Sequence, residues 1–316
     1  MDTAVGKVVS ISLLVIFAVM PVLAPLVGEP YYVDVFARIM LWAMAALGLN
    51  LILGFGGMVS FGHAAYVGVG AYTVGILSHH GVSSGFLQWP LAIGLSGIFA
   101  AIFGAISLRT RGIYFIMITL AFSQMLYFLA VSLEQYGSND GLLVPERSDF
   151  SIGTLHAGID DDHAIYYVIL CILVLCLYAK SRLIAGRFGM ILKGIKSNET
   201  RLQALGVSTY RYRLAAFTLS GMICGLSGVL FANFEGFVSP DLMHWTRSGE
   251  VLIMVILGGA GMLFGPLFGA TVFLLLSEVL ARFTDYWNII FGPILILVVL
   301  YAKGGIGGLF RGRNRG

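Results

Sequence analysis

The sequence predicts an all-α polytopic membrane protein, and three observations support this fold class. Of the 316 residues, 58% are hydrophobic and only 11% are charged, whereas soluble domains carry about 25% charged residues. The apolar residues gather in long runs along the chain. Two glycine-rich stretches interrupt those runs. We therefore expect a single transmembrane domain, residues 1–316, with about ten transmembrane helices, some of them broken at glycine.

Each apolar run is a candidate for a spanning helix, which needs roughly 20 mostly apolar residues. The first run follows a single lysine, is long for a signal peptide, and has no clear cleavage site after it, so we expect a retained helix. The shorter runs lie beside the glycine-rich stretches. In chain order the runs are Val8–Leu26, Val35–Leu53, Ala64–Leu77, Phe86–Leu108, Ile113–Leu133, Ala164–Ala179, Leu214–Phe231, Val251–Phe264, Leu267–Leu280 and Ile289–Ala302.

The charges between the runs predict the orientation. Residues 180–213 hold eight lysines and arginines and one acid, Glu199, and the tail after Lys303 is also basic. Basic segments of membrane proteins lie in the cytoplasm, whereas the acidic segment 134–163 is expected outside. An even number of crossings between the two basic regions requires the glycines at 258–265 to separate two helices. Both termini are then cytoplasmic.

The two glycine-rich stretches read GFGGMVSFGHAAYVGVGAY, residues 54–72, and LGGAGMLFGP, residues 257–266. Glycine costs roughly 1 kcal/mol in a helix interior relative to alanine. Broken helices within a membrane are tolerated where they are buried in protein or line a cavity, and paired broken segments indicate a transport site. Gly258, Gly259 and Gly261 are therefore candidates for a substrate pathway. The alternative is that these glycines only let helices pack closely.

Several polar residues lie within the apolar regions. His63, with Ser60 nearby, is a functional candidate because ionisable groups are rare inside membranes; the alternative is a hydrogen-bonded structural histidine. Asn50, one turn before the first glycine stretch, is a pathway candidate expected to hold a freed backbone carbonyl. Glu278 is expected to pair with Arg282. The three cysteines, Cys171, Cys176 and Cys224, are expected to be small apolar packing residues, with no disulfide or metal site.

The cytoplasmic segment contains a short amphipathic helix. Ser197 or Asn198 can cap its start, Gly206 can end it, and Leu202 and Leu205 share one face. Such a short helix needs a docking surface for stability, which is either the membrane surface or a partner protein. No GxxxxGK[ST] phosphate-binding sequence occurs in the chain, so no ATP site of its own is expected.

Three stretches together resemble the branched-chain amino acid permeases of bacterial ATP-binding cassette (ABC) importers. Residues 47–72 look like the hallmark sequence of that family. The residues around 196–199 and 204–206 resemble its ATPase-coupling loop, and residues 249–269 its C-terminal glycine region. The likeness covers nearly the whole chain. The long segment before Ala164 is more similar to the LivM type of subunit than to the shorter LivH type.

The resemblance implies a subunit of the bacterial cytoplasmic (inner) membrane with several partners. These are a second permease of the LivH type, two ATP-binding subunits of the LivG and LivF types that hold ATP and magnesium, and a periplasmic binding protein. It implies no cofactor in this chain, no catalytic or metal-ligating residue, and no nucleic-acid partner. The residues that it assigns to the pathway are Gly56, Gly57, Ser60, Gly62 and His63. Those that it assigns to ATPase coupling are Lys196, Ser197, Asn198, Glu199, Arg201, Ala204 and Gly206.

The resemblance leaves alternatives for the solute and for the energy source. Leucine, isoleucine and valine are the expected solutes, but the same family includes permeases for urea and short-chain amides. An ion-coupled secondary transporter would need a coupling-ion site, and acids other than Glu278 are scarce in the apolar runs. An intramembrane enzyme would need a set of catalytic residues, which His63 alone does not supply.

Overall fold

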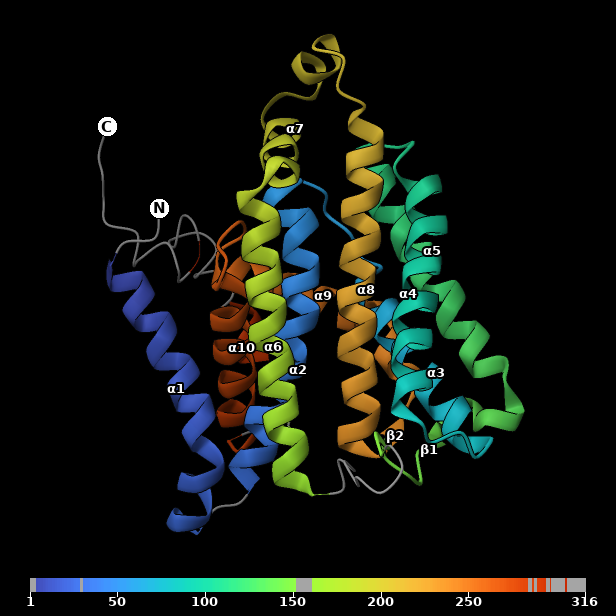
Figure 1. The fold of residues 1–316 in the computed structure, drawn as a ribbon, viewed down its shortest axis with the longest axis vertical. Coiled ribbons are helices and arrows are strands. Elements are labelled where there is room, and N and C mark those ends of the chain that lie inside the picture. Colours follow the sequence, from blue (N-terminus) through green and yellow to red (C-terminus); the bar gives the residue numbers. More distant parts are fainter. Residues whose placement is uncertain are drawn as a thin grey trace.

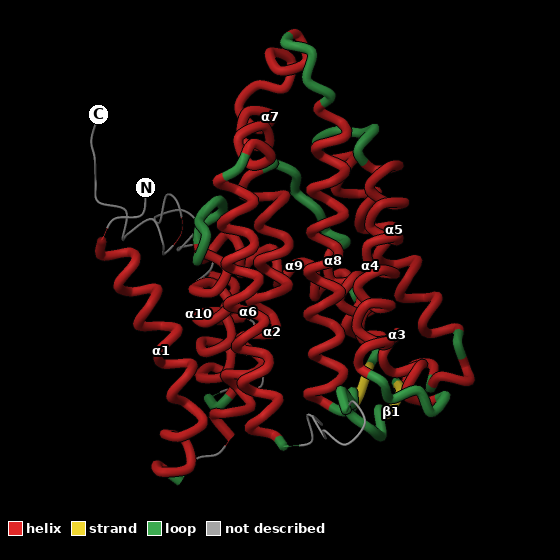
Figure 2. Tube along the Cα trace, viewed as in Figure 1, coloured by secondary structure: helices red, strands yellow, loops and turns green. Residues whose placement is uncertain are grey.

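The structure is a computed structural model that describes residues 4–28, 31–151 and 161–283, together with 286, 289–293, 296 and 305. Helices dominate the described residues and stand side by side in one bundle (Figures 1 and 2). They are α1 (Ala4–Val27), α2 (Tyr31–Asn50), α3 (His63–His79), α4 (Gly85–Ser107), α5 (Ile113–Ser132), α6 (Asp162–Ala185), α7 (Arg187–Ala204), α8 (Thr209–Glu235), α9 (Trp245–Gly258) and α10 (Gly265–Ala281).

Five helical segments of the described residues are long and apolar enough to cross a membrane: Tyr31–Phe55, Gly85–Ser107, Ile113–Ser132, Asp162–Ala185 and Thr209–Glu235. Two shorter apolar helices, Val9–Ala24 and Gly265–Ala281, accompany them. The predicted all-α class is confirmed. The count of ten spans and the cytoplasmic termini stay predictions, and the last predicted run, Ile289–Ala302, lies largely outside the described residues.

Helix α2 lies at the centre of the bundle, with α8 against it. In the most apolar part of the segment Tyr31–Phe55, which contains α2, 89% of the residues are buried, compared with 28% in the most apolar part of α5. Along α8, Ser220 Oγ donates to the Gly48 carbonyl at 2.6 Å and Ser227 Oγ to the Leu41 carbonyl at 2.7 Å. Between them, Cys224 Sγ contacts the Ala45 carbonyl at 3.5 Å. Because these positions recur every three to four residues, they form one stripe facing α2.

The charged segments lie at opposite ends of the bundle, as the sequence predicts. Arg111, in the turn between α4 and α5, forms an ion pair with Glu199 of α7. The acidic segment lies at the other end, where β1 (Leu142–Leu143) pairs with β2 (Phe237–Val238) after α8 (Figure 1). This short antiparallel pair was not predicted. It ties the described part of segment 134–163 to the bundle, and residues 152–160 of that segment lie outside the described residues.

The limits of α6, α8 and α9 differ from those of the predicted runs. Helix α6 continues to Ala185 and α8 begins at Thr209, so segment 180–213 is mostly helix rather than a loop. Helix α9 begins and ends six residues before the predicted run Val251–Phe264. Its first turns are polar and partly exposed, and Arg247 pairs there with Glu250 at 2.9 Å. The limits of the apolar run therefore did not mark the limits of the helix.

Candidate functional site

The first glycine-rich stretch breaks the chain between α2 and α3, as predicted. Helix α2 continues through a π-helical turn, Leu51–Phe55, and α3 starts only at His63. Gly57 has φ +70° in the connection, a left-handed conformation that favours glycine. Helix α3 has 17 residues, about 25 Å at 1.5 Å per residue, which is less than the hydrocarbon thickness of about 30 Å. The break therefore lies within the depth of the bundle.

The second glycine-rich stretch breaks the chain between α9 and α10. Helix α9 ends at Gly258, and α10 begins at Gly265 with Pro266 in its first turn. Gly259 has φ +105° and Gly261 has φ +89°, so the connection turns where other residues would be strained. The predicted separation into two helices is confirmed.

Asn50 joins the two breaks. Its Nδ2 donates to the Met262 carbonyl at 2.7 Å, and its Oδ1 accepts from the Gly261 amide at 2.9 Å. The asparagine is fully buried. It was expected to hold a freed carbonyl, and it does, but that carbonyl belongs to the other glycine-rich stretch. A Cβ at Gly54 would collide with Asn50 Oδ1 and with the Gly261 amide, so this close approach requires glycine.

Side chains from other helices satisfy the start of α3, where a helix leaves backbone N–H groups without partners. The Phe61 amide donates to Thr119 Oγ1 of α5 at 3.2 Å. The Ala64 amide donates to Ser248 Oγ, in the first turns of α9, at 3.1 Å. Since the chain just after α9 contacts Asn50, α9 reaches from the start of α3 back to the end of α2 and so bridges the first break.

His63 has a structural hydrogen bond and a second ring nitrogen without one. Its Nδ1 lies 2.9 Å from Ser60 Oγ, and Tyr66 and Phe217 pack edge-on against the ring. The side chain is buried, and Nε2 has no hydrogen-bond partner among the described residues. The geometry at Nδ1 fits the structural alternative. A direct role in contacting solute stays a prediction, as does the pathway role of the other residues of this group.

Several glycines of the breaks also allow close packing, which was the alternative interpretation. A Cβ at Gly62 would lie 2.7 Å from the Thr119 carbonyl, and one at Gly56 would lie 2.7 Å from the Ile52 carbonyl. A Cβ at Gly258 would collide with the Gly265 carbonyl, and one at Gly70 with the Gly225 carbonyl of α8. The two interpretations are therefore compatible, because the same residues shape the breaks and let the helices approach.

The predicted short amphipathic helix is present as the second part of α7, and its cytoplasmic location stays a prediction. Asn198 interrupts α7 with φ −159° and ψ 96°, and its Oδ1 accepts from the Arg201 amide at 2.9 Å, as a helix cap does. At the other end, Gly206 has φ +80° and the Val207 amide donates to the Leu202 carbonyl at 3.1 Å, which is a Schellman ending. The first part of α7, from Arg187, was not predicted.

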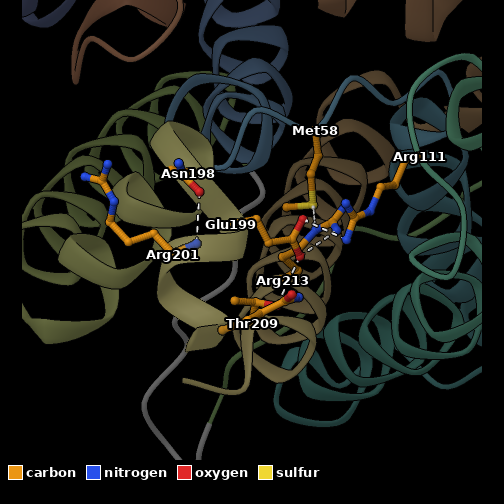
Figure 3. A network of polar contacts seen from close by, with 8 residues as sticks. Met58, Arg111, Asn198, Glu199, Arg201, Thr209 and Arg213 are labelled. Atoms are coloured by element: carbon orange, nitrogen blue, oxygen red, sulfur yellow. Dashed lines mark hydrogen bonds and ion pairs between the residues drawn. The ribbon is translucent and has the colours of Figure 1, made fainter. Parts of the chain in front are cut away.

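The residues assigned to ATPase coupling divide into exposed and engaged groups. All of them except Glu199 are exposed, and two of the exposed residues, Lys196 and Asn198, also make hydrogen bonds. The Glu199 side chain is only 19% exposed and is held by Arg111 at 3.2 Å and Arg213 at 3.4 Å. It also accepts a hydrogen bond from Thr209, and Figure 3 shows these side chains converging on the carboxylate.

Three lysines lie around the α7 end of α2, where helix carbonyls attract positive charge. Lys196 Nζ donates to the Gly54 carbonyl at 2.7 Å. Lys180 is buried, its Nζ donates to the Leu47 carbonyl at 3.1 Å, and it lies over the Phe55 ring with Lys193. Lys180 was predicted to lie beyond its apolar run, in the basic segment 180–213, but it lies inside α6, which continues to Ala185. In the sequence, the only signal for the contact between Lys180 and Leu47 was a lysine directly after an apolar run.

Comparison with known proteins gives relatives over most of the chain. The family pattern for "branched-chain amino acid transport system / permease component" matches residues 31–299. The high-affinity branched-chain amino acid transport system permease protein LivM of Salmonella typhimurium is 29% identical, over 87% of this chain and 69% of the relative. LivM of Escherichia coli K12 is 28% identical, over 93% of this chain and 74% of the relative.

A third relative is of the LivH type. The permease protein LivH of Escherichia coli K12 is 24% identical, over 84% of this chain and 90% of the relative. No solved structure gave a significant match to the chain. Because the family pattern covers most of the sequence, and because apolar helices of spanning length make up the bundle, this chain belongs to the permease family of branched-chain amino acid transport systems and is a multi-pass membrane protein.

Proposed function

We propose that this chain is the LivM-type permease subunit of an ABC importer that carries leucine, isoleucine and valine across the bacterial inner membrane. The observation that carries the proposal is the family match over residues 31–299. The LivM relatives, at 28–29% identity, support this choice of solute.

The two breaks and the contact between them support a pathway at the junction of α2, α3, α9 and α10. Broken segments with free backbone groups are the usual solute sites of membrane transporters. The candidates that meet or flank the junction are Asn50, Gly56, Gly57, Ser60, Gly62, His63, Gly258, Gly259 and Gly261. In this proposal the glycines, which have no side chain, let the broken helices approach one another closely.

The proposed partners are those that the resemblance implies. A LivH-type permease is the proposed second subunit, since a LivH protein is itself similar to this chain. Two ATP-binding subunits of the LivG and LivF types would dock on the exposed residues from Ser197 to the end of α7 and hold ATP and magnesium. A periplasmic binding protein would deliver the solute to the opposite face.

Uptake in cells tests the solute and the energy source together. Labelled leucine and labelled urea are supplied to cells lacking this gene, with and without the gene restored. Each arm is repeated after ATP depletion and, separately, after the proton gradient is collapsed while ATP is maintained. We expect restored leucine uptake that stops with ATP depletion and survives collapse of the gradient.

The other outcomes separate the alternatives. Uptake that stops with the gradient while ATP persists would mean an ion-coupled secondary transporter and would contradict the proposal. Restored urea uptake without leucine uptake would keep the ABC mechanism and change the solute. As a second test, Gly57→Leu and Gly62→Leu should each abolish uptake while leaving the amount of inserted protein unchanged, and normal uptake by both variants would contradict the pathway assignment.

A further inference from the structure

The first part of α7 is attached directly to the first break. Lys196 Nζ donates to the Gly54 carbonyl at 2.7 Å. Gly54 lies in the π-helical turn that ends α2, where the last carbonyls of a helix lack intrahelical partners. An ammonium donor makes this bond roughly twice as strong as a neutral one. The lysine stem also lies against the connection, because a Cβ at Gly57 would be 3.1 Å from Lys196 Cγ.

The carbonyl that Lys196 holds belongs to the point where the two breaks meet. The Gly54 carbonyl oxygen would lie 3.1 Å from a Cβ at Gly261, and Asn50 bonds the Gly261 amide beside it. Gly54 therefore contacts both Lys196 and the second break, so that a movement of Lys196 can displace the second break through this one residue. This contact joins the helix expected to face the ATP-binding subunits to the segments expected to face the solute.

The second part of α7, beyond the kink at Asn198, has an attachment of its own. Glu199 binds Arg213 of α8, and Arg213 Nε contacts Met58 Sδ at 3.5 Å (Figure 3). Met58 is buried in the connection between α2 and α3. Both sides of the kink are thus joined to the same break, one directly and one through α8.

We infer that Lys196 is a positioning residue that transmits movement of α7 to the two broken segments, and that Glu199 with Arg213 provides a second, indirect attachment. The inference rests on the proposed function, because ATP-binding subunits would supply the movement. In this arrangement the Glu199 carboxylate is occupied within the chain. Docking of the ATPases then falls to the exposed residues from Ser197 to the end of α7 and just beyond it, such as Ser197, Arg201 and Leu205.

The test compares Lys196→Met with Lys196→Arg in the complete transporter reconstituted in proteoliposomes. Methionine keeps an unbranched stem and removes the ammonium, whereas arginine keeps a donor. The matched control is Arg187→Met, which removes one positive charge from an exposed position of the same helix. Labelled leucine uptake and phosphate release are measured together, so that the solute moved per ATP hydrolysed is obtained.

We expect Lys196→Met to hydrolyse ATP at nearly the wild-type rate while its uptake per ATP falls at least about tenfold, as loss of one charge-assisted hydrogen bond allows. Lys196→Arg should recover most of the coupling, and Arg187→Met should match the wild type. Unchanged uptake per ATP in Lys196→Met would overturn the inference. An equal loss of hydrolysis and uptake in both Lys196 variants would also overturn it, because α7 would then only hold the assembly together.

Hydrogen exchange provides a readout that does not depend on the solute. Amides of residues 51–62 should exchange several-fold faster in Lys196→Met than in the wild type, because the first break loses its anchor. Arg187→Met should leave them unchanged. Equal exchange in all three proteins would overturn the anchoring role even if leucine proves to be the wrong solute. Failure of the wild type to move leucine with ATP would contradict the proposed function instead.

Discussion

Asn50 of α2 binds both the carbonyl of Met262 and the amide of Gly261, and Gly261 lies 211 residues further along the chain. Each of these backbone groups belongs to a turn rather than to a helix interior. Without the asparagine, the carbonyl and the amide would each lose this hydrogen bond. Each lost hydrogen bond of a buried group costs about 1–3 kcal/mol of stability. One side chain therefore sets the separation of the two breaks.

Asn50→Ala should lower the stability of the purified protein and abolish uptake. We expect a loss of about 2 kcal/mol or more, because two backbone groups lose their partner at once. Thermal unfolding in detergent measures the change. Asn139→Ala, at an exposed position beyond α5, is the control and should unfold at the wild-type temperature. An Asn50→Ala protein as stable and as active as the control would show that the two breaks do not depend on this contact.

Gly54→Ala should push the two breaks apart, because the added methyl group needs space that the second break occupies. The added Cβ would collide with Asn50 Oδ1 and the Gly261 amide, and overpacking of this kind costs about 1–3 kcal/mol. Gly94→Ala in α4 is a matched control, because a Cβ there meets nothing within 4 Å. Alanine is the better helix former, so the control should gain up to about 1 kcal/mol. If both variants shift the unfolding temperature in the same direction, the close approach at Gly54 does not require glycine.

The breaks could be predicted from the sequence because glycine and proline act locally. The clusters around Gly57 and Gly261 weaken a helix whatever surrounds them, and the cap at Asn198 and the stop at Gly206 follow from neighbouring residues alone. Charge likewise predicted that the basic segment 180–213 and the acidic segment 134–163 lie at opposite ends of the bundle. These features need no knowledge of the tertiary fold.

The partners could not be predicted, because they come from distant parts of the chain. Nothing near Asn50 indicates that its partner is Met262, and nothing near Ala64 indicates that Ser248 holds its amide. Lys180 was misplaced for a related reason. Positive charge usually marks the end of a span, but a long side chain can extend back to a backbone carbonyl inside the bundle, as Lys180 does at Leu47.

The seam between α2 and α8 should lose stability in small, additive steps. Ser220→Ala and Ser227→Ala each remove one hydrogen bond to an α2 carbonyl. Such interhelical bonds are worth about 0.6 kcal/mol on average in membrane proteins. The two serines are two turns apart on α8, so the double variant should lose about the sum. Ser132→Ala is the control, because the exposed Ser132 hydroxyl donates to the Phe128 carbonyl of its own helix. A double variant no less stable than this control would exclude the seam as a source of stability.

Glu199→Gln should loosen the second part of α7. The carboxylate forms ion pairs with two guanidinium groups and accepts a hydrogen bond from one of them, Arg213. Hydrogen bonds to charged groups contribute about 1.5–3 kcal/mol. Because Arg111 is largely exposed, we expect the lower part of that range. Local opening should then rise roughly tenfold, and protease cleavage tracks the open population when reclosing is fast.

Limited trypsin digestion measures this opening at Arg201, which is exposed two residues beyond Glu199. Glu146→Gln makes the same charge change at the opposite end of the bundle and should leave cleavage at Arg201 unchanged. High salt should raise cleavage in the wild type more than in Glu199→Gln, since salt screens a charged pair and has less effect on an amide. Equal cleavage of the wild type and Glu199→Gln at low salt would mean that the capped turn at Asn198, rather than the ion pairs, fixes this part of α7.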